Sequence, residues 1–198
     1  MANAVTVDTL SAVGKELAGA AALILPDERL DVICYACTSG SMVLGEQRVA
    51  RELSKGADGA KPTSLIAGVI AALNELQVRR VVVGTPYLDE LNVMEKDYLE
   101  ARGFEVLQIQ GLNITNDADM VKVAPDFIKE FALGIDRPDA EAIFISCGAL
   151  RSLDVVDEIE RAVQKPVIAS NQAMIWQTLR MAGVADRIDG YGRLLREF

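Results

Sequence analysis

Short apolar runs alternate along this chain with longer segments of helical periodicity, and two of the runs end in a cysteine. Leu30–Ala36 leads into Cys37-Thr-Ser-Gly-Ser, and Ala142–Ser146 leads into Cys147-Gly-Ala-Leu-Arg. Buried parallel strands that turn into helices have this pattern. Because open α/β sheets bind ligands at the carboxyl ends of their strands, we expect both thiols at one binding site.

The remaining segments continue the alternation. Strands are expected at 81–84, 105–110 and 167–169, with an extended piece at 61–64, and helices at 6–25, 41–55, 64–76, 89–101, 119–133 (interrupted at Pro125), 153–163 and 170–181. Thr6, Ser64 and Ser170-Asn171 are the expected N-terminal caps of three of these helices. The alternation predicts an α/β fold with a parallel sheet and helices on both faces.

Composition excludes several classes of protein. The 198 residues carry a formal net charge of −9 without a Lys/Arg cluster, so neither nucleic acid nor a membrane is expected as a partner. The chain has no apolar run of membrane-spanning length and no leader pattern, and its three cysteines are too few for a disulfide scaffold. We therefore expect a soluble cytoplasmic protein. No Gly-rich nucleotide fingerprint is present, so we expect no nucleotide cofactor.

The two strand-end cysteines carry the strongest chemical signal. The chain has no histidine, and a thiol at a helix N-terminus is activated as a nucleophile or base. Thr38 and Ser39 after Cys37, and Gly148 after Cys147, offer hydroxyls and backbone N–H groups to an anion. Each thiol alone is equally explained as a small buried side chain, but their recurrence favours function. Cys34 is expected in the core, and three cysteines without histidine fall short of a zinc site.

Other polar residues follow strand ends on the same predicted edge. Tyr87 lies in the Thr85-Pro86-Tyr87 loop, Asn116 in the loop after 105–110, and Asn171 at the start of the last long helix. Singly, these residues are explained as a loop tyrosine, a turn residue and a helix cap. Their convergence with the thiols predicts a site for a small carboxylate.

The segments around these residues resemble a known family. Cys37-Thr-Ser-Gly-Ser, Thr85-Pro-Tyr-Leu-Asp-Glu-Leu-Asn92, Phe144-Ile-Ser-Cys-Gly-Ala-Leu-Arg151 and Ser170-Asn-Gln-Ala173 are similar to maleate cis–trans isomerase, arylmalonate decarboxylase and the ectoine-utilisation racemase-like proteins of the Asp/Glu racemase superfamily. The resemblance implies two similar lobes, each a mostly parallel sheet flanked by helices, with the active site between them and no cofactor. Residues 1–77 with 180–198 would form the first lobe, and 78–179 the second.

The resemblance also implies a reaction. Decarboxylases of the group keep only the second cysteine, so the presence of both favours a cofactor-independent isomerase of a small dicarboxylate such as maleate. Cys37 would add to the double bond as a thiolate, and Cys147 would move a proton at the neighbouring carbon. Thr38, Ser39, Tyr87, Asn116, Gly148 and Asn171 would hold the substrate.

Two alternatives remain open at this stage. A racemase of an amino acid or of an ectoine-derived intermediate would use the same pair of thiols on opposite faces of a carbon. Relatives also carry an earlier N-terminal strand that contributes carboxylate-binding groups, so the first lobe is expected to be incomplete. An inactive shortened paralogue that only binds a carboxylate is therefore the second alternative. Self-association into a homo-oligomer is expected, because an incomplete lobe exposes apolar surface.

Overall fold

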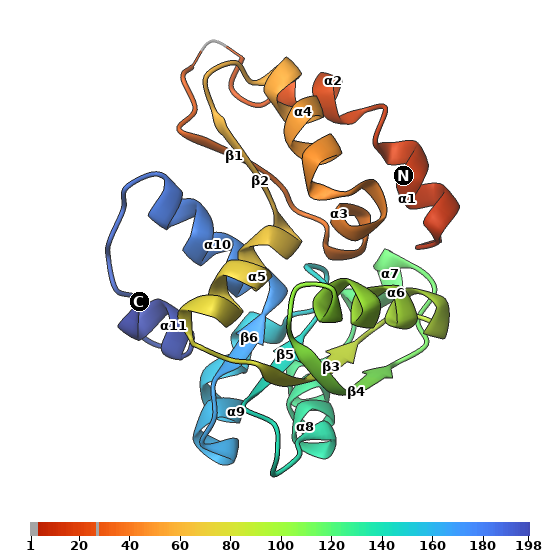
Figure 1. The fold of residues 1–198 in the computed structure, drawn as a ribbon, viewed down its shortest axis with the longest axis vertical. Coiled ribbons are helices and arrows are strands. Elements are labelled where there is room, and N and C mark those ends of the chain that lie inside the picture. Colours follow the sequence, from red (N-terminus) through yellow and green to blue (C-terminus); the bar gives the residue numbers. More distant parts are fainter. Residues whose placement is uncertain (1–3, 27) are drawn as a thin grey trace.

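The computed structural model describes residues 4–26 and 28–198 and shows an α/β fold (Figure 1). The strands are β1 (Val32–Tyr35), β2 (Lys61–Ser64), β3 (Arg80–Thr85), β4 (Glu105–Gly111), β5 (Ala142–Ile145) and β6 (Val167–Ala169). The helices are α1 (Val7–Val13), α2 (Leu17–Ala22), α3 (Thr38–Leu44), α4 (Glu46–Gly56), α5 (Leu65–Glu75), α6 (Asp89–Glu100), α7 (Asp117–Met120), α8 (Pro125–Ile135), the 3-10 turn η1 (Ser152–Asp154), α9 (Val156–Val163), α10 (Ser170–Met181) and α11 (Arg193–Glu197).

The strands form two sheets, and all their pairings are parallel, as the alternation predicted. The pair β1–β2 runs in register from Val32 opposite Lys61 to Tyr35 opposite Ser64. The larger sheet has the order β4-β3-β5-β6, and all its pairings are parallel. The chain therefore has the two-lobe arrangement that the family resemblance implied, with one sheet in each lobe (Figure 1). The residue boundaries given above for the lobes stay a prediction.

Alternate residues of the larger sheet face opposite layers of helices. Val83 and Phe144 belong to a buried cluster with residues of α5, α10 and α11, whereas Val82 and Ile143 belong to a second cluster with residues of α8 and α9. Both faces of the central strands are thus covered, which explains why their sequences are continuously apolar. A smaller third cluster joins β1 to α2 and α4 in the first lobe.

Helices α5 and α10 lie between the two sheets and pack against each other (Figure 1). A side chain at Gly68 of α5 would come within 3.0 Å of the Ala173 carbonyl oxygen of α10. The absence of a Cβ atom at Gly68 therefore permits the close approach of the two helices. This contact fixes the position of the α10 N-terminus relative to the strand ends of both lobes.

Several helix boundaries differ from the sequence prediction. The helix expected at 6–25 is divided into α1 and α2, although Thr6 caps α1 as predicted, with its Oγ1 accepting from the Thr9 N–H. The helix expected at 41–55 begins already at Thr38 and breaks at Gly45, whose φ of 77° is the left-handed conformation that glycine tolerates. Pro125 does not interrupt a helix but starts α8, where its missing N–H costs nothing.

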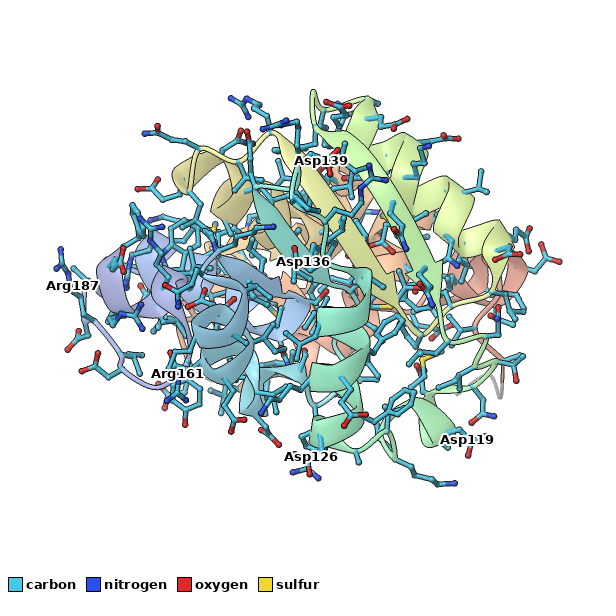
Figure 2. All side chains as sticks on the ribbon, turned by 90° about the horizontal axis from the view of Figure 1, so that it is seen from below. Asp119, Asp126, Asp136, Asp139, Arg161 and Arg187 are labelled. Carbon is cyan, nitrogen blue, oxygen red and sulfur yellow. The ribbon has the colours of Figure 1, made fainter. Side chains whose placement is uncertain are left out.

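Figure 2 shows the charged side chains of Asp126 and Arg187 extending from the ribbon at the periphery. Both residues are exposed. Among the described residues, no helix is long and apolar enough to cross a membrane.

Candidate active site

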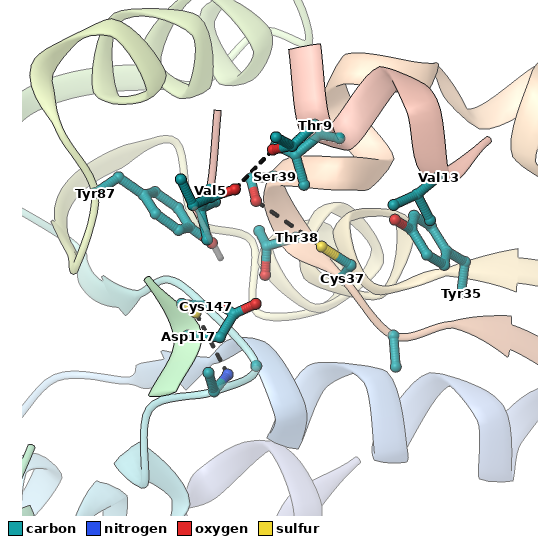
Figure 3. A pocket seen from close by; sticks show the side chains of 15 residues that line it. Val5, Thr9, Val13, Tyr35, Cys37, Thr38, Ser39, Tyr87, Asp117 and Cys147 are labelled. Carbon is teal, nitrogen blue, oxygen red and sulfur yellow. Dashed lines mark hydrogen bonds between the residues drawn. The ribbon is translucent and has the colours of Figure 1, made fainter. Parts of the chain in front are cut away.

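A cavity of about 430 Å³ lies where the strand ends of both lobes meet α1 (Figure 3). The predicted site residues that line it are Cys37, Thr38, Ser39, Tyr87, Cys147 and Gly148. Further lining residues were not expected from the sequence, namely Ala4, Val5, Thr9, Leu10, Val13, Tyr35, Ala36, Asp117 and Ala149. Strand ends far apart in the sequence therefore converge on one cavity, as their pattern indicated.

Cys37 occupies the N-cap position of α3, in the setting that the sequence predicted. Its backbone is extended, with a φ of −140°, and its Sγ accepts a hydrogen bond of 3.3 Å from the Gly40 N–H. The Ser39 hydroxyl lies 3.9 Å from the same sulfur. An N–H donor aimed at the sulfur stabilises negative charge there, which suits a thiolate nucleophile.

Cys147 lies in a tight turn after β5 and not at a helix N-terminus. Cys147 has a φ of 88°, an uncommon conformation for a residue with a side chain, and the η1 turn begins at Ser152, near the helix start expected at 153. The Cys147 N–H donates to the Ser170 Oγ at 3.0 Å, and the Ala149 N–H donates to the Cys147 Sγ at 3.4 Å. These two bonds hold the turn and direct the thiol toward the cavity.

Burial decides the protonation of Cys147, whose side chain is only 5% exposed. Desolvation raises its pKa to about 11, against the opposing effects of the Ala149 N–H and the Tyr87 hydroxyl, which both stabilise the thiolate. Near neutral pH the Cys147 side chain is therefore an uncharged thiol that can donate a proton.

Tyr87 reaches the cavity from the loop between β3 and α6. The Tyr87 N–H donates to the Thr85 Oγ1 at 3.1 Å, and the Thr85 hydroxyl donates to the Asn92 Oδ1 at 2.5 Å. Burial, followed by the nearby Cys147, raises the pKa of Tyr87 well above its usual value. The Tyr87 hydroxyl therefore stays protonated and can donate a hydrogen bond to an anion.

Thr38 and Cys147 are joined through Ser170, whose position between a strand and a helix predicts a helix cap. The Thr38 hydroxyl donates to the Ser170 Oγ at 3.0 Å, and Ser170 also accepts from the Cys147 N–H. The Ala169 N–H at the start of α10 is satisfied instead by the Gln172 Oε1. The expected capping role of Ser170 was wrong, because its hydroxyl points toward the site.

Asn116 and Asn171 are not among the residues that line the cavity. The Asn116 Oδ1 accepts from the Asp119 N–H and caps α7, while its amide donates to the Asp119 carboxylate. The Asn171 amide donates to the Leu150 carbonyl oxygen at 3.5 Å. Contact of either side chain with a substrate stays a prediction. For such a contact, the asparagine amide would have to give up its present hydrogen bond and bond to the substrate instead.

The N-terminal segment forms a wall of the cavity that no sequence pattern predicted. Val5, Leu10 and Val13 line it, and the Val5 N–H donates to the Thr115 carbonyl oxygen at 2.8 Å. This bond ties the start of the described chain to the loop that precedes α7. Tyr35 also lines the cavity, and its position two residues before Cys37 was the one available signal.

Asp117 is the one charged side chain among the lining residues, and Figure 3 shows it near Cys147. Within the described parts of the chain, no group of three or more His, Cys, Asp or Glu side chains lies close enough together to hold a metal ion. An anionic ligand in this cavity would therefore be bound by hydroxyls and backbone N–H groups.

Comparisons with known proteins show the family of this chain. The sequence profile of the arylmalonate decarboxylase family matches residues 3–195. The chain is 30% identical over 183 residues to the maleate isomerase of Nocardia farcinica, covering 88% of this chain and 73% of that protein. It is 32% identical over 147 residues to the arylmalonate decarboxylase of Bordetella bronchiseptica, covering 71% of this chain and 60% of that protein.

The fold is also similar to solved structures. A cysteine-to-serine mutant of the Nocardia farcinica maleate cis–trans isomerase, with a covalently bound succinylcysteine intermediate, superposes with a TM-score of 0.90 at 26% identity. That match covers 99% of this chain and 83% of the solved chain.

Proposed function

Since this chain belongs to the arylmalonate decarboxylase family, we propose that it is a cofactor-independent isomerase of a small dicarboxylate such as maleate. In this proposal Cys37 and Cys147 act as a pair. The single observation that carries it is that two thiols, which come from the ends of β1 and β5, line one cavity. The succinylcysteine in the related isomerase supports covalent addition of a cysteine to the substrate.

The reaction begins with addition of Cys37. Its thiolate attacks one carbon of the cis double bond, so that a carbon–sulfur bond forms and the electron pair moves to the neighbouring carbon and its carboxylate. Cys147, protonated because of its burial, donates a proton to that carbon. The former double bond is now a single bond about which the adduct rotates.

The second half reverses these steps in the rotated adduct. The Cys147 thiolate removes the proton, the double bond re-forms with trans geometry, and the Cys37 thiolate leaves. The two cysteines end in their starting protonation states, so no other reactant is consumed. A neutral Cys147 and an N–H donor on the Cys37 sulfur support this division of roles.

Hydroxyl and N–H groups of the cavity would bind the carboxylates. The protonated Tyr87 hydroxyl, the Ser39 hydroxyl and the Gly148 N–H would donate to an anion that lies between the thiols, a role supported by the presence of all three residues in the cavity lining. The Thr38 hydroxyl donates to Ser170, so its role is to hold the two lobes in register. Donors fixed in this way stabilise the charge that develops on the carboxylate during addition.

One observation favours a second function. The Asp117 carboxylate in the cavity lining would attract a substrate ammonium group. An amino-acid racemase would use Cys37 and Cys147 to exchange the α-proton between the two faces of the carbon.

Covalent capture separates these functions. The Cys147→Ser protein, which lacks the proton-donating thiol, is incubated with maleate and digested, and the peptides are analysed by mass spectrometry. The isomerase proposal expects the mass of one maleate on the Cys37 peptide, and no adduct in the Cys37→Ser protein. Turnover of maleate by the unaltered protein without any adduct on Cys37 would contradict the covalent mechanism.

A further inference from the structure

A buried carboxyl group lies directly behind the Cys147 turn and has no part in the reaction described above. Glu95, in the middle of α6, is 0% exposed. Its Oε1 accepts a hydrogen bond of 2.6 Å from the hydroxyl of Ser146, the residue that precedes Cys147. Its Oε2 is also buried and has no hydrogen-bond partner in the described part of the chain.

The elements packed around Glu95 provide no cation to balance a charge. Helix α3 carries no titratable side chain, and neither does β5. The charged residues of β3 and β4, Arg80 and Glu105, lie at the strand starts, away from the site. The titratable groups on the site side are the Tyr87 hydroxyl, which is affected by the charge of Glu95, and the Cys147 thiol beyond Ser146.

This environment favours the uncharged form of Glu95. Burial raises its pKa to about 7, with the Ser146 hydroxyl opposing the shift. Once ionised, the carboxylate would place an unpaired negative charge near Tyr87 and behind Cys147. Such a charge opposes every anion formed in the cavity, including the Cys147 thiolate and a bound carboxylate.

We propose that Glu95 is a positioning residue for Cys147, which it holds through Ser146, and that it supports the reaction only while it carries its proton. The Ser146 hydroxyl anchors one side of the strained Cys147 turn, and Ser170 anchors the other. When Glu95 loses its proton, the hydrogen bond from the Ser146 hydroxyl remains, but the new negative charge disfavours the Cys147 thiolate. This inference rests on the proposed role of Cys147 as the proton carrier.

Two substitutions separate the anchor from the charge. Glu95→Gln keeps an acceptor for Ser146 and cannot ionise, whereas Glu95→Leu removes both properties. Glu160→Gln is the matched control, because Glu160 is a buried carboxyl that accepts from the Val167 and Arg193 N–H groups and does not line the cavity. The unaltered protein and the three variants are compared from about pH 5 to about pH 10.

The first readout needs no substrate. Iodoacetamide alkylates thiolates, so the rate at which the Cys147 peptide gains the label, followed by mass spectrometry, reports the thiolate fraction of Cys147. Above neutral pH we expect Glu95→Gln to be labelled about tenfold faster than the unaltered protein, because the opposing charge is gone. Glu160→Gln should behave as the unaltered protein does.

The second readout is turnover of maleate. In the unaltered protein kcat should fall as pH rises through about 7, and in Glu95→Gln this decline should shift to higher pH. Glu95→Leu should lose about tenfold in kcat at every pH with a smaller change in KM, because the Ser146 anchor is missing.

Alkylation and pH–rate profiles of Glu95→Gln that superpose on those of the unaltered protein would overturn the proposal. If Glu95→Leu fails to fold, the Glu95→Gln profiles decide the question alone. If the unaltered protein does not convert maleate, the proposed function fails, while the alkylation profile still tests the role of Glu95.

Discussion

The hydroxyl of Thr38 donates a hydrogen bond of 3.0 Å to the hydroxyl of Ser170, 132 positions later in the chain. Because Ser170 also accepts from the Cys147 N–H, this bond connects the start of α3, which carries Cys37 at its N-cap, to the Cys147 turn. The relative position of the two thiols therefore depends on one buried serine.

Replacing this serine tests the connection. In Ser170→Ala, the Cys147 N–H and the Thr38 hydroxyl lose their shared acceptor, and we expect unfolding in urea to show a loss of roughly 1–3 kcal/mol together with reduced kcat. Thr178→Ala is the control on the same helix, since the Thr178 hydroxyl bonds only to carbonyl oxygens of α10. A Ser170→Ala protein with unchanged kcat would show that the turn is held by other contacts.

A second prediction concerns the space beside Cys37. A Cβ atom at Gly40 would meet the Tyr35 hydroxyl and lie 2.9 Å from the Cys37 Sγ, so Gly40→Ala must displace the thiol. We expect a large loss of kcat in steady-state assays. In contrast, Gly19→Ala in α2 meets nothing within 4 Å and should raise stability by up to about 1 kcal/mol. Wild-type turnover in Gly40→Ala would mean that the Cys37 position is not critical.

The pH dependence of stability provides a third prediction. Because the pKa of Glu95 is raised from 4.5 to about 7 in the folded protein, the folded chain keeps a proton that the unfolded chain loses. The resulting stabilisation is full below about pH 4.5 and is lost as pH rises to about 7. The shift corresponds to roughly 3 kcal/mol, so the unfolding free energy of the unaltered protein should fall by that amount relative to Glu95→Gln.

Glu141→Gln is a control for that experiment, because the contribution of Glu141 to stability should depend on pH in the opposite direction. The N–H groups of Arg80 and Arg79 lower the pKa of the Glu141 carboxyl, so its contribution is present at neutral pH and is lost as the pH falls. Urea titrations at a series of pH values give the difference in unfolding free energy between the unaltered protein and each variant. As the pH rises, this difference should change in one direction for Glu95→Gln and in the opposite direction for Glu141→Gln. Parallel curves for Glu95→Gln and the unaltered protein would place the Glu95 pKa at its usual value.

The sequence was sufficient for the fold class and for the polar residues that follow the strand ends in the cavity. Short apolar runs such as Val81–Gly84 are typical of buried strands, and parallel strands bring their carboxyl ends to one edge. Cys37, Tyr87 and Cys147 could therefore be placed together without coordinates. The cap of α1 by Thr6 could also be predicted, because it depends on two residues that are three positions apart in the sequence.

Features that depend on distant contacts could not be predicted in this way. Ser170 follows a strand and precedes a helix, which is a capping pattern, yet its hydroxyl bonds to Thr38 and Cys147. The positive φ of Cys147 has no local signature, since it is held by a residue 23 positions away. Glu95 is four residues from Leu91 and from Leu99, on the buried face of α6, but only the structure shows that Ser146 is its hydrogen-bond partner.

The most direct test of the cysteine pair is proton NMR of the purified protein in D2O with maleate, compared with Cys37→Ser, Cys147→Ser and the control Cys34→Ser. We expect fumarate to form with the unaltered protein and with Cys34→Ser, and the rate to fall by about a thousandfold or more in each of the other two variants. In parallel samples of D- and L-aspartate and glutamate, deuterium at the α-carbon would identify a racemase instead. Fumarate formation at the unaltered rate in either Cys37→Ser or Cys147→Ser would contradict the paired mechanism.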